Sequence, residues 1–242
     1  MTDASMKTWA TKKGIVEKRI MKKRTTKTRT MRQWILAALV ICILGTVTAC
    51  SSGADGETTV ESTEKEKELS RGTVDGNVYT SEFIGLSFTK PDMWVYSTDE
   101  EIAQLMDVGA EILNSSNFSA EAAKLVTVYD MMARDLLTGN NINITFENLQ
   151  KSAASNVTEE QYLAAFEQLM TNQASAMNYK FSDVSERTLA GQTFHHVKAT
   201  GAYMGVEFDQ HVYIRKEGIY MIVMTLSIFD GSDIATYEAM FK

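Results

Sequence analysis

The side chain with the clearest chemistry in this sequence is the thiol of Cys50, which follows the small residues Thr48 and Ala49. An uncharged run from Trp34 to Val47 precedes them, and residues 1–33 hold 11 Lys and Arg against two acidic residues. A basic segment, a short apolar segment and small residues at a cleavage site define a secretory signal. Cleavage directly before Cys50 leaves an N-terminal cysteine whose thiol can carry a diacylglycerol.

The tetrapeptide Val47-Thr48-Ala49-Cys50 resembles the lipobox of bacterial lipoproteins. The resemblance implies that a signal peptidase recognises Val47, Thr48 and Ala49, and that Cys50 begins the mature chain with palmitate or a similar acyl group attached. The lipid on Cys50 then holds the protein on the extracytoplasmic face of a bacterial membrane. The uncharged run of 14 residues is shorter than the roughly 20 that a membrane-spanning helix needs. An ordinary cleaved signal and an uncleaved anchor are the alternatives.

The only histidine set consists of His195, His196 and His211. Neighbouring strand residues point to opposite faces of a sheet, so His195 and His196 cannot face the same ion. A turn at residues 202–205 would bring His196 across from His211, which gives at most two ligands. Zinc sites take three or four protein ligands, so we predict no metal site.

No other pattern in the sequence indicates catalysis. The serines lack the G-x-S-x-G elbow of a nucleophile, and the isolated glycines do not form a phosphate loop. Asp130, Asp135 and Glu147 could approach one another in space, but their spacing does not establish a carboxylate pair. Cys42 leaves with the signal, so Cys50 has no partner for a disulfide within one chain. We expect no cofactor and no enzymatic activity; an extracytoplasmic enzyme with an unrecognised active site is the alternative.

The charge of the chain changes sign at the cleavage site. The whole sequence has a net charge of −7, but from Cys50 onward 13 Lys and Arg stand against 29 Asp and Glu, a net charge of −16. Nucleic-acid binding depends on cations that replace counterions along the phosphates. The acidic mature chain is therefore not expected to bind nucleic acid.

The composition divides the chain into three parts. Residues 1–49 are the predicted signal, although Met21-Lys22-Lys23-Arg24 begins a signal of more ordinary length and we expect translation to start at Met21. Residues 50–76 are polar and acidic, with too few large apolar residues to offset the entropy of ordering, so they predict a flexible tether after the lipidated cysteine. Residues 77–242 are long enough for one globular domain.

The domain is expected to be α+β, with an antiparallel sheet and an N-terminal hairpin flanked by helices. Residues 78–83 and 86–88 alternate about Ile84-Gly85, which predicts the hairpin. Capping-box patterns at Thr98 and Thr158 predict the starts of two helices. The first helix is expected to bury Ile102, Leu105, Met106, Ile112 and Leu113 on one face.

Strand patterns account for most of the remaining domain. Residues 125–133 and 142–146 predict two strands, the first with Val126, Val128 and Met132 on one face. Short turns join four further predicted strands into an antiparallel meander, near residues 180–187, 193–200, 206–215 and 219–228. Residues 233–241 predict a terminal helix.

The segment from Tyr79 to Trp94 contains the pattern F-x-G-L-x-F-x-x-P-x-x-W, which begins at Phe83. It resembles the opening of PsbP-like domains, in which a hairpin is followed by a helix and an antiparallel sheet. DcrB-type and other bacterial lipoproteins are similar. The resemblance implies an α/β/α sandwich that is usually non-enzymatic, and no metal ligand of the photosynthetic members matches a residue of this chain.

We therefore expect a membrane-anchored extracytoplasmic lipoprotein that acts as a non-catalytic binding or accessory module. Its partners are the membrane, through the lipid on Cys50, and a protein, cell-envelope component or small ligand that the sequence does not identify. Trp94 follows the hairpin and precedes a capped helix, a position where a large aromatic side chain closes a core. We predict that Trp94 is buried.

Overall fold

The computed structural model describes residues 67–152 and 156–242. The elements within these ranges are β1 (Thr73–Asp75), β2 (Val78–Ser81), β3 (Leu86–Thr89), β4 (Trp94–Tyr96), α2 (Asp99–Met106), α3 (Ala110–Leu113), α4 (Phe118–Ala122), β5 (Thr127–Asp135), β6 (Asn141–Asn148), α5 (Glu159–Gln173), a 3-10 turn (Ser175–Met177), β7 (Lys180–Phe181), β8 (Ser185–Leu189), β9 (Gln192–Tyr203), β10 (Val206–Glu217), β11 (Tyr220–Ile228) and α6 (Ile234–Glu238).

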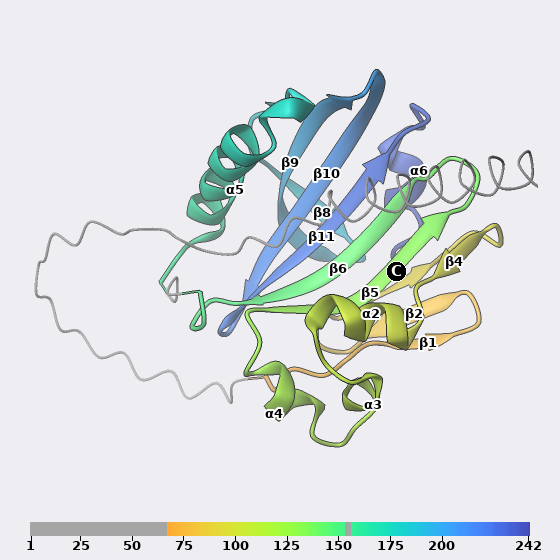
Figure 1. Ribbon diagram of the computed structural model, residues 1–242, viewed down its shortest axis with the longest axis vertical. Coiled ribbons are helices and arrows are strands. Elements are labelled where there is room, and N and C mark those ends of the chain that lie inside the picture. The colour runs from red at the N-terminus through yellow and green to blue at the C-terminus, as the bar shows by residue number, and fades with distance from the viewer. Residues whose placement is uncertain (1–66, 153–155) are drawn as a thin grey trace, which may run out of the picture. The chain divides into compact units, whose positions relative to one another are not determined.

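The strands form two antiparallel sheets (Figure 1). The larger sheet has the order β4-β5-β6-β11-β10-β9-β7, and β8 pairs with β9 beside this path. The smaller sheet has the order β1-β2-β3. The C-terminal residues extend it, since Phe241 forms a bridge with Phe88 and the backbone of Lys242 exchanges two hydrogen bonds with Ser87.

Aromatic side chains join the smaller sheet to one face of the larger one. Phe83, at the turn of the hairpin, meets the ring of Phe146 on β6 at a centroid distance of 5.2 Å. Trp94 is 5% exposed and lies between the rings of Phe88 and Tyr237. The prediction that Trp94 belongs to the core is confirmed. Its aromatic neighbours come from β3, near the start of the domain, and from α6, near its end. The buried ring of Trp94 therefore packs both segments against the larger sheet.

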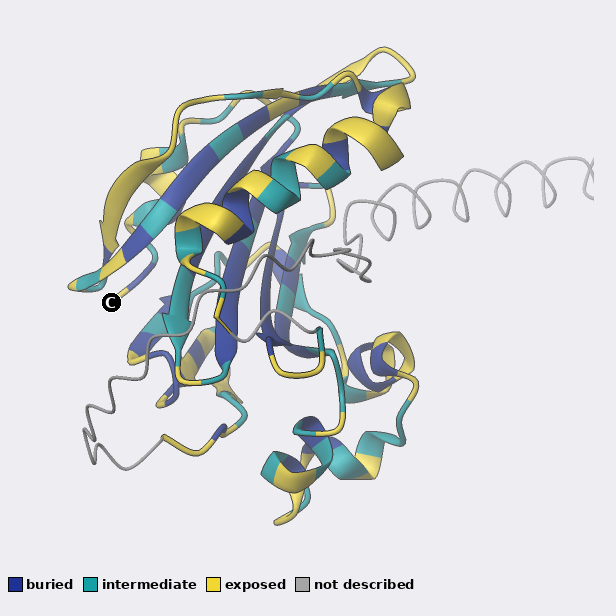
Figure 2. Cartoon of the chain, turned by 90° about the vertical axis from the view of Figure 1, so that its left-hand side faces the viewer, coloured by how far each residue is buried: buried dark blue, intermediate teal, exposed yellow. Residues whose placement is uncertain are grey.

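The helices cover other parts of the larger sheet. α5 packs on β9 and β10, and α2 packs on β5 (Figure 1). Both helices begin with the predicted capping box, in which the threonine hydroxyl and the side chain three residues later accept each other's backbone N–H groups. Buried residues run along the strands, whereas the helices mix buried and exposed positions (Figure 2). The predicted α+β class, the hairpin and the meander of β8 to β11 are confirmed.

The first predicted helix is wrong in its extent. Asp107 adopts a left-handed conformation with φ 55°, and its N–H bonds back to Ala103 and Gln104, which ends α2. The chain then restarts as the short helices α3 and α4. Leu105 is 42% exposed and does not belong to the buried face. Within α2 the buried side is formed by Ile102, Ala103 and Met106, and the left-handed Asp107 turns the residues that follow it away from this helical stripe.

The predicted face of β5 is also wrong, because the strand contains a β-bulge. Tyr129 pairs with Thr145 of β6, but Met131 pairs with the next residue, Ile144, so Asp130 is the extra residue. A bulge shifts the alternation of side chains by one position. Val128 therefore shares its buried face with Met131, and Met132 points to the other side.

The N-terminal boundary of the domain differs from the prediction. Residues 67–76 were assigned to the tether, but Leu69 is 3% exposed and Thr73–Asp75 form β1 against β2. The segment is too polar to order by itself, and it is held by hydrogen bonds and by the pocket for Leu69. Residues 50–66 of the predicted tether lie outside the described residues.

Candidate functional site

A network of polar contacts surrounds the segment Lys67–Asp75, which we name the N-terminal strap. Gly72 in this strap donates its N–H to both carboxylate oxygens of Asp130, at 2.9 and 3.2 Å. The hydroxyl of Tyr79 donates to the same carboxylate. The bulge in β5 explains why the aspartate can meet the strap, since the extra residue of a bulge is free of the regular ladder.

The carboxylate of Asp130 is fully buried, and this shapes its acidity. Desolvation raises the pKa of Asp130 to about 6, against the opposing effects of the Tyr79 hydroxyl, the Gly72 N–H and the nearby charge of Arg71. Burial and the adjacent carboxylate also raise the pKa of Tyr79 well above its ordinary value. At neutral pH the pair holds a carboxylate and a neutral phenol, joined by a hydrogen bond.

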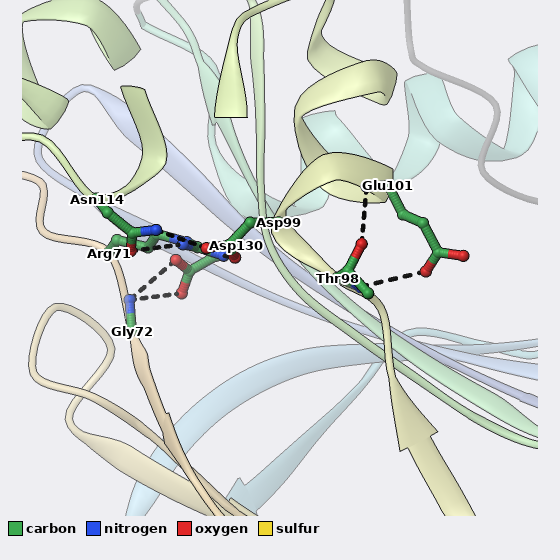
Figure 3. A network of polar contacts seen from close by, with 7 residues as sticks. All are labelled: Arg71, Gly72, Thr98, Asp99, Glu101, Asn114 and Asp130. Atoms are coloured by element: carbon green, nitrogen blue, oxygen red, sulfur yellow. Dashed lines mark hydrogen bonds and ion pairs between the residues drawn. The ribbon is translucent and has the colours of Figure 1, made fainter. Parts of the chain in front are cut away.

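A second set of contacts forms a closed ring beside Asp130 (Figure 3). Arg71 in the strap donates to Asp99 at the start of α2 at 2.6 Å, and to Asn114 at the end of α3 at 3.4 Å. Asn114 in turn donates its amide to the other oxygen of Asp99 at 2.6 Å. The hydrogen bond from Arg71 lowers the pKa of Asp99, so Asp99 is a carboxylate at neutral pH. The ring joins three separate segments of the chain.

Two hollows flank the strap at Arg71. The first, about 360 Å³ in volume, lies between the strap, the start of α2 and the bulge, and is lined by Ser97, Asp99 and Asp130 among others. The second, about 390 Å³, lies between the strap and the helices α3 and α4, and is lined by Ser70, Ser116 and Phe118 among others. Arg71, Gly72, Thr73 and Asn114 line both hollows. Pockets of this size with converging polar groups are typical of small-ligand sites.

The close approach of the strap to Tyr79 gives a direct test of this geometry. A Cβ atom at Gly72 would lie 2.2 Å from Cε2 of Tyr79, a ring that is completely buried. Gly72→Ala should therefore lower the free energy of unfolding by about 1–3 kcal/mol through overpacking, measured by urea denaturation followed by circular dichroism. Gly109→Ala is the matched control, because its new Cβ meets only the mobile end of Glu111. Equal unfolding midpoints for the two variants would contradict the close packing.

The predicted proximity of His196 and His211 is confirmed, but the two residues do not lie directly across from each other. His196 pairs directly with Tyr213 and His211 with Lys198, so the two histidines are diagonal neighbours on one face. Nε2 of His196 lies 3.0 Å from Nδ1 of His211, and Ser185 Oγ lies 3.2 Å from Nδ1 of His196. His195 points away and lies 3.6 Å from Glu160 of α5.

The histidine pair is poorly suited to activate Ser185. Desolvation lowers the pKa of both His196 and His211 to about 4. A general base works best with a pKa near the working pH, and an imidazole with a pKa of about 4 accepts a proton weakly at neutral pH. The pair instead satisfies its own hydrogen bonds within the sheet. In the described parts of the chain, no group of three His, Cys, Asp or Glu is arranged to hold a metal.

The three carboxylates considered from the sequence meet different partners. Asp135 accepts from the N–H of Leu137 and the hydroxyl of Thr138, both at 2.8 Å, and so stabilises the turn after β5. Glu147 is buried beside Tyr162 of α5, and desolvation raises its pKa to about 7. Of the three, Asp130 lines the first of the two hollows described above. Sequence reasoning missed Arg71, Tyr79, Asp99 and Asn114, which carry no motif.

The residues of the predicted lipid site, Val47, Thr48, Ala49 and Cys50, lie outside the described residues. So does Met21, the expected start of translation. Within residues 67–152 and 156–242, no helix has the length and apolar character needed to cross a membrane.

Comparison with solved structures finds weak similarities. The structure is similar to cyanobacterial PsbP (CyanoP) from Synechocystis sp. PCC 6803, with 13% identity, 78% of this chain and 97% of that chain covered, and a TM-score of 0.41. A protein from Bacteroides thetaiotaomicron VPI-5482 shares 12% identity over 70% of this chain and 48% of that chain, with a TM-score of 0.36. LpqN, involved in cell envelope biogenesis of Mycobacterium tuberculosis, shares 13% identity over 64% of this chain and 77% of that chain, with a TM-score of 0.34.

No family model and no curated protein matches the sequence. CyanoP, a cyanobacterial PsbP, belongs to the family that the hairpin pattern resembles. With every TM-score below 0.5, the similarities assign no role to this chain.

Proposed function

We propose that this protein is a lipid-anchored binding module on the extracytoplasmic face of a bacterial membrane, and that its ligand site is the pair of hollows flanking Arg71. One observation carries the proposal. The strap that forms a wall of both hollows is the described part of the chain that lies nearest in sequence to Cys50. A ligand bound in these hollows would contact the segment of the domain that follows the proposed anchor in the sequence.

The chemistry of the hollows favours binding over bond-making. Asp130 is the carboxyl group in them whose pKa is raised, and its carboxylate accepts hydrogen bonds from the Gly72 N–H and the Tyr79 hydroxyl. Arg71, Asp99 and Asn114 are hydrogen-bonded to one another. Covalent catalysis usually needs a nucleophile that is hydrogen-bonded to a matched base. The residues that line the hollows instead supply hydroxyl, amide and backbone groups that can hydrogen-bond to a ligand.

The anchoring half of the proposal is tested with Cys50→Ala. The wild-type chain, expressed in a bacterial host with labelled palmitate, is expected to incorporate the label and to sediment with the membranes. Cys50→Ala should lose the label and either leave the membrane fraction or keep its signal uncleaved. Cys42→Ala is the matched control, because Cys42 lies inside the signal and should leave labelling unchanged.

Intact-mass measurement of the membrane-bound form decides the processing site. The expected mature chain begins at Cys50 and carries added acyl mass. A mature chain that begins at another residue, with no added acyl mass, would rule out the lipid anchor while leaving the two hollows to be tested separately.

A further inference from the structure

The second hollow, between the strap and the helices α3 and α4, has a hydroxyl-rich rim; we name it the serine hollow. Its rim includes Ser70, Ser115, Ser116 and Ser119, together with the amide of Asn114. Serine hydroxyls and asparagine amides both donate and accept hydrogen bonds. Ser115 donates its proton to the carbonyl of Ile112 at 3.0 Å, so its oxygen still offers lone pairs to a ligand. Such a rim complements a molecule that itself carries many hydroxyl groups.

The floor of the serine hollow is apolar. Leu69 from the strap, Leu113 from α3 and Phe118 from α4 line it, and they are 3%, 3% and 7% exposed. An apolar floor below a polar rim suits a ring with a hydrocarbon face and hydroxyl groups at its edge. The hollow of about 390 Å³ falls in the range of about 300–1,000 Å³ that small-molecule sites occupy. Its size therefore accommodates one or two sugar rings.

The charge of the hollow selects against anions. Arg71 is the only cationic side chain in its lining, and Asp99 already neutralises it at 2.6 Å. Glu68 at the rim adds a negative charge. An anion such as phosphate would meet no uncompensated positive charge there, and the acidic chain as a whole would repel it. A neutral ligand pays no such penalty.

A polar group near the hollow also lacks a protein partner. The Nε atom of Arg71 is buried and has no hydrogen-bond partner among the described residues. Native structures seldom leave a buried donor unsatisfied, and such a group calls for a bound water or ligand nearby. Arg71 lines both hollows, and its Nε atom is closed to solvent, so this group does not by itself indicate a ligand in the serine hollow.

We infer that the serine hollow binds a neutral saccharide unit, with the sugar hydroxyls on the serine and asparagine rim and the ring on the floor of Leu69, Leu113 and Phe118. The inference rests on the proposed function and names the ligand class of one of its two hollows. The saccharide is either a free sugar or a unit of a cell-wall glycan, which share this chemistry.

The test uses the full chain purified in detergent and saturation-transfer NMR. The probes are a panel of neutral mono- and disaccharides, and insoluble peptidoglycan stripped of charged polymers in a sedimentation assay. Inorganic phosphate and sulfate are the anion probes, and because they carry no observable protons their binding is measured by isothermal titration calorimetry. The wild type should bind at least one neutral saccharide and neither anion. Ser116→Leu and Ser119→Leu, which place apolar side chains on the rim, should weaken binding by on the order of tenfold or more. Thr171→Leu is the matched control, an exposed hydroxyl on α5 outside the lining of the hollow.

The outcomes separate the inference from the proposed function. Binding of a free sugar that the rim variants abolish supports a small-molecule ligand, and binding of peptidoglycan alone, lost in the same variants, supports a wall glycan. Failure of every neutral saccharide and of peptidoglycan overturns the inference. Binding of phosphate or sulfate at the hollow overturns the saccharide class but leaves a binding module. Saccharide binding that the rim variants leave unchanged overturns the site. The anchoring result for Cys50→Ala is independent of all five outcomes.

Discussion

Trp94→Ala is expected to lower the free energy of unfolding by about 3–5 kcal/mol, the usual cost of removing a large aromatic side chain from a core. The indole is 5% exposed, and its ring lies 6.4 Å from that of Phe88 and 5.7 Å from that of Tyr237. These neighbours belong to β3 and to α6, so the cavity would loosen both the smaller sheet and the terminal helix. Typical domains are stable by about 5–15 kcal/mol, and the variant should lose a large part of that.

Urea denaturation followed by circular dichroism measures this loss. Trp94→Phe is the control, since it keeps an aromatic ring against Phe88 and Tyr237 and should be destabilised less than the alanine variant. In a chain that begins at Cys50, Trp94 is the sole tryptophan, so its emission should be blue-shifted and poorly quenched by iodide. An alanine variant that unfolds at the wild-type urea concentration would show that the ring contributes no core packing.

The second large effect is a pH-dependent stability that Asp130 controls. The pKa of Asp130 is raised from 3.8 to about 6 in the folded chain. A carboxyl group with a raised folded pKa contributes stability that is complete below the unfolded pKa and is lost as the pH rises through the folded pKa. Between about pH 4.5 and about pH 7.5, ionisation of Asp130 should cost the folded state about 2 kcal/mol. Asp130→Asn cannot ionise and should lack this cost.

The comparison of wild type and Asp130→Asn at the two pH values isolates this effect. Glu147, with its pKa raised to about 7, acts in the same direction, whereas His196 and His211, with pKa values lowered to about 4, destabilise the fold as the pH falls from 6.5 toward 4. These groups are present in both proteins, so their effects on stability cancel when wild type and Asp130→Asn are compared. Glu147→Gln serves as a second control that removes a different buried carboxyl group. A constant stability difference between wild type and Asp130→Asn at both pH values would mean that the carboxyl group titrates normally.

The parts of the fold that the sequence predicted are those set by neighbouring residues. Thr98 and Thr158 specify helix starts because the capping box is completed within three residues. The hairpin follows from alternation on both sides of Gly85, whose φ of +79° suits a residue without a Cβ. Trp94 was identified as a core residue from its place between the hairpin and a helix.

The parts that the sequence did not predict depend on residues far apart in the chain. The bulge at Asp130 is visible only when β5 is aligned with β6. The strap is too polar to indicate a strand, yet β1 pairs with β2, and Asp130, 58 positions away from Gly72, accepts the N–H of Gly72. The ring of Arg71, Asp99 and Asn114 combines three segments without any motif. Asp130 was noticed from the sequence as a possible member of a carboxylate group, and its actual partners are a phenol and a backbone amide.

The position of the strap has a mechanical consequence. Tension on the chain between Cys50 and the domain reaches the strap before it reaches any strand of the larger sheet. The strap resists with three residue pairs to β2, the contacts of Gly72 with Asp130, and the ion pair of Arg71 with Asp99. The larger sheet, by contrast, is joined by long ladders such as the nine pairs between β10 and β11. A pull through the proposed anchor would therefore detach the strap first and open both hollows while the rest of the domain stayed folded.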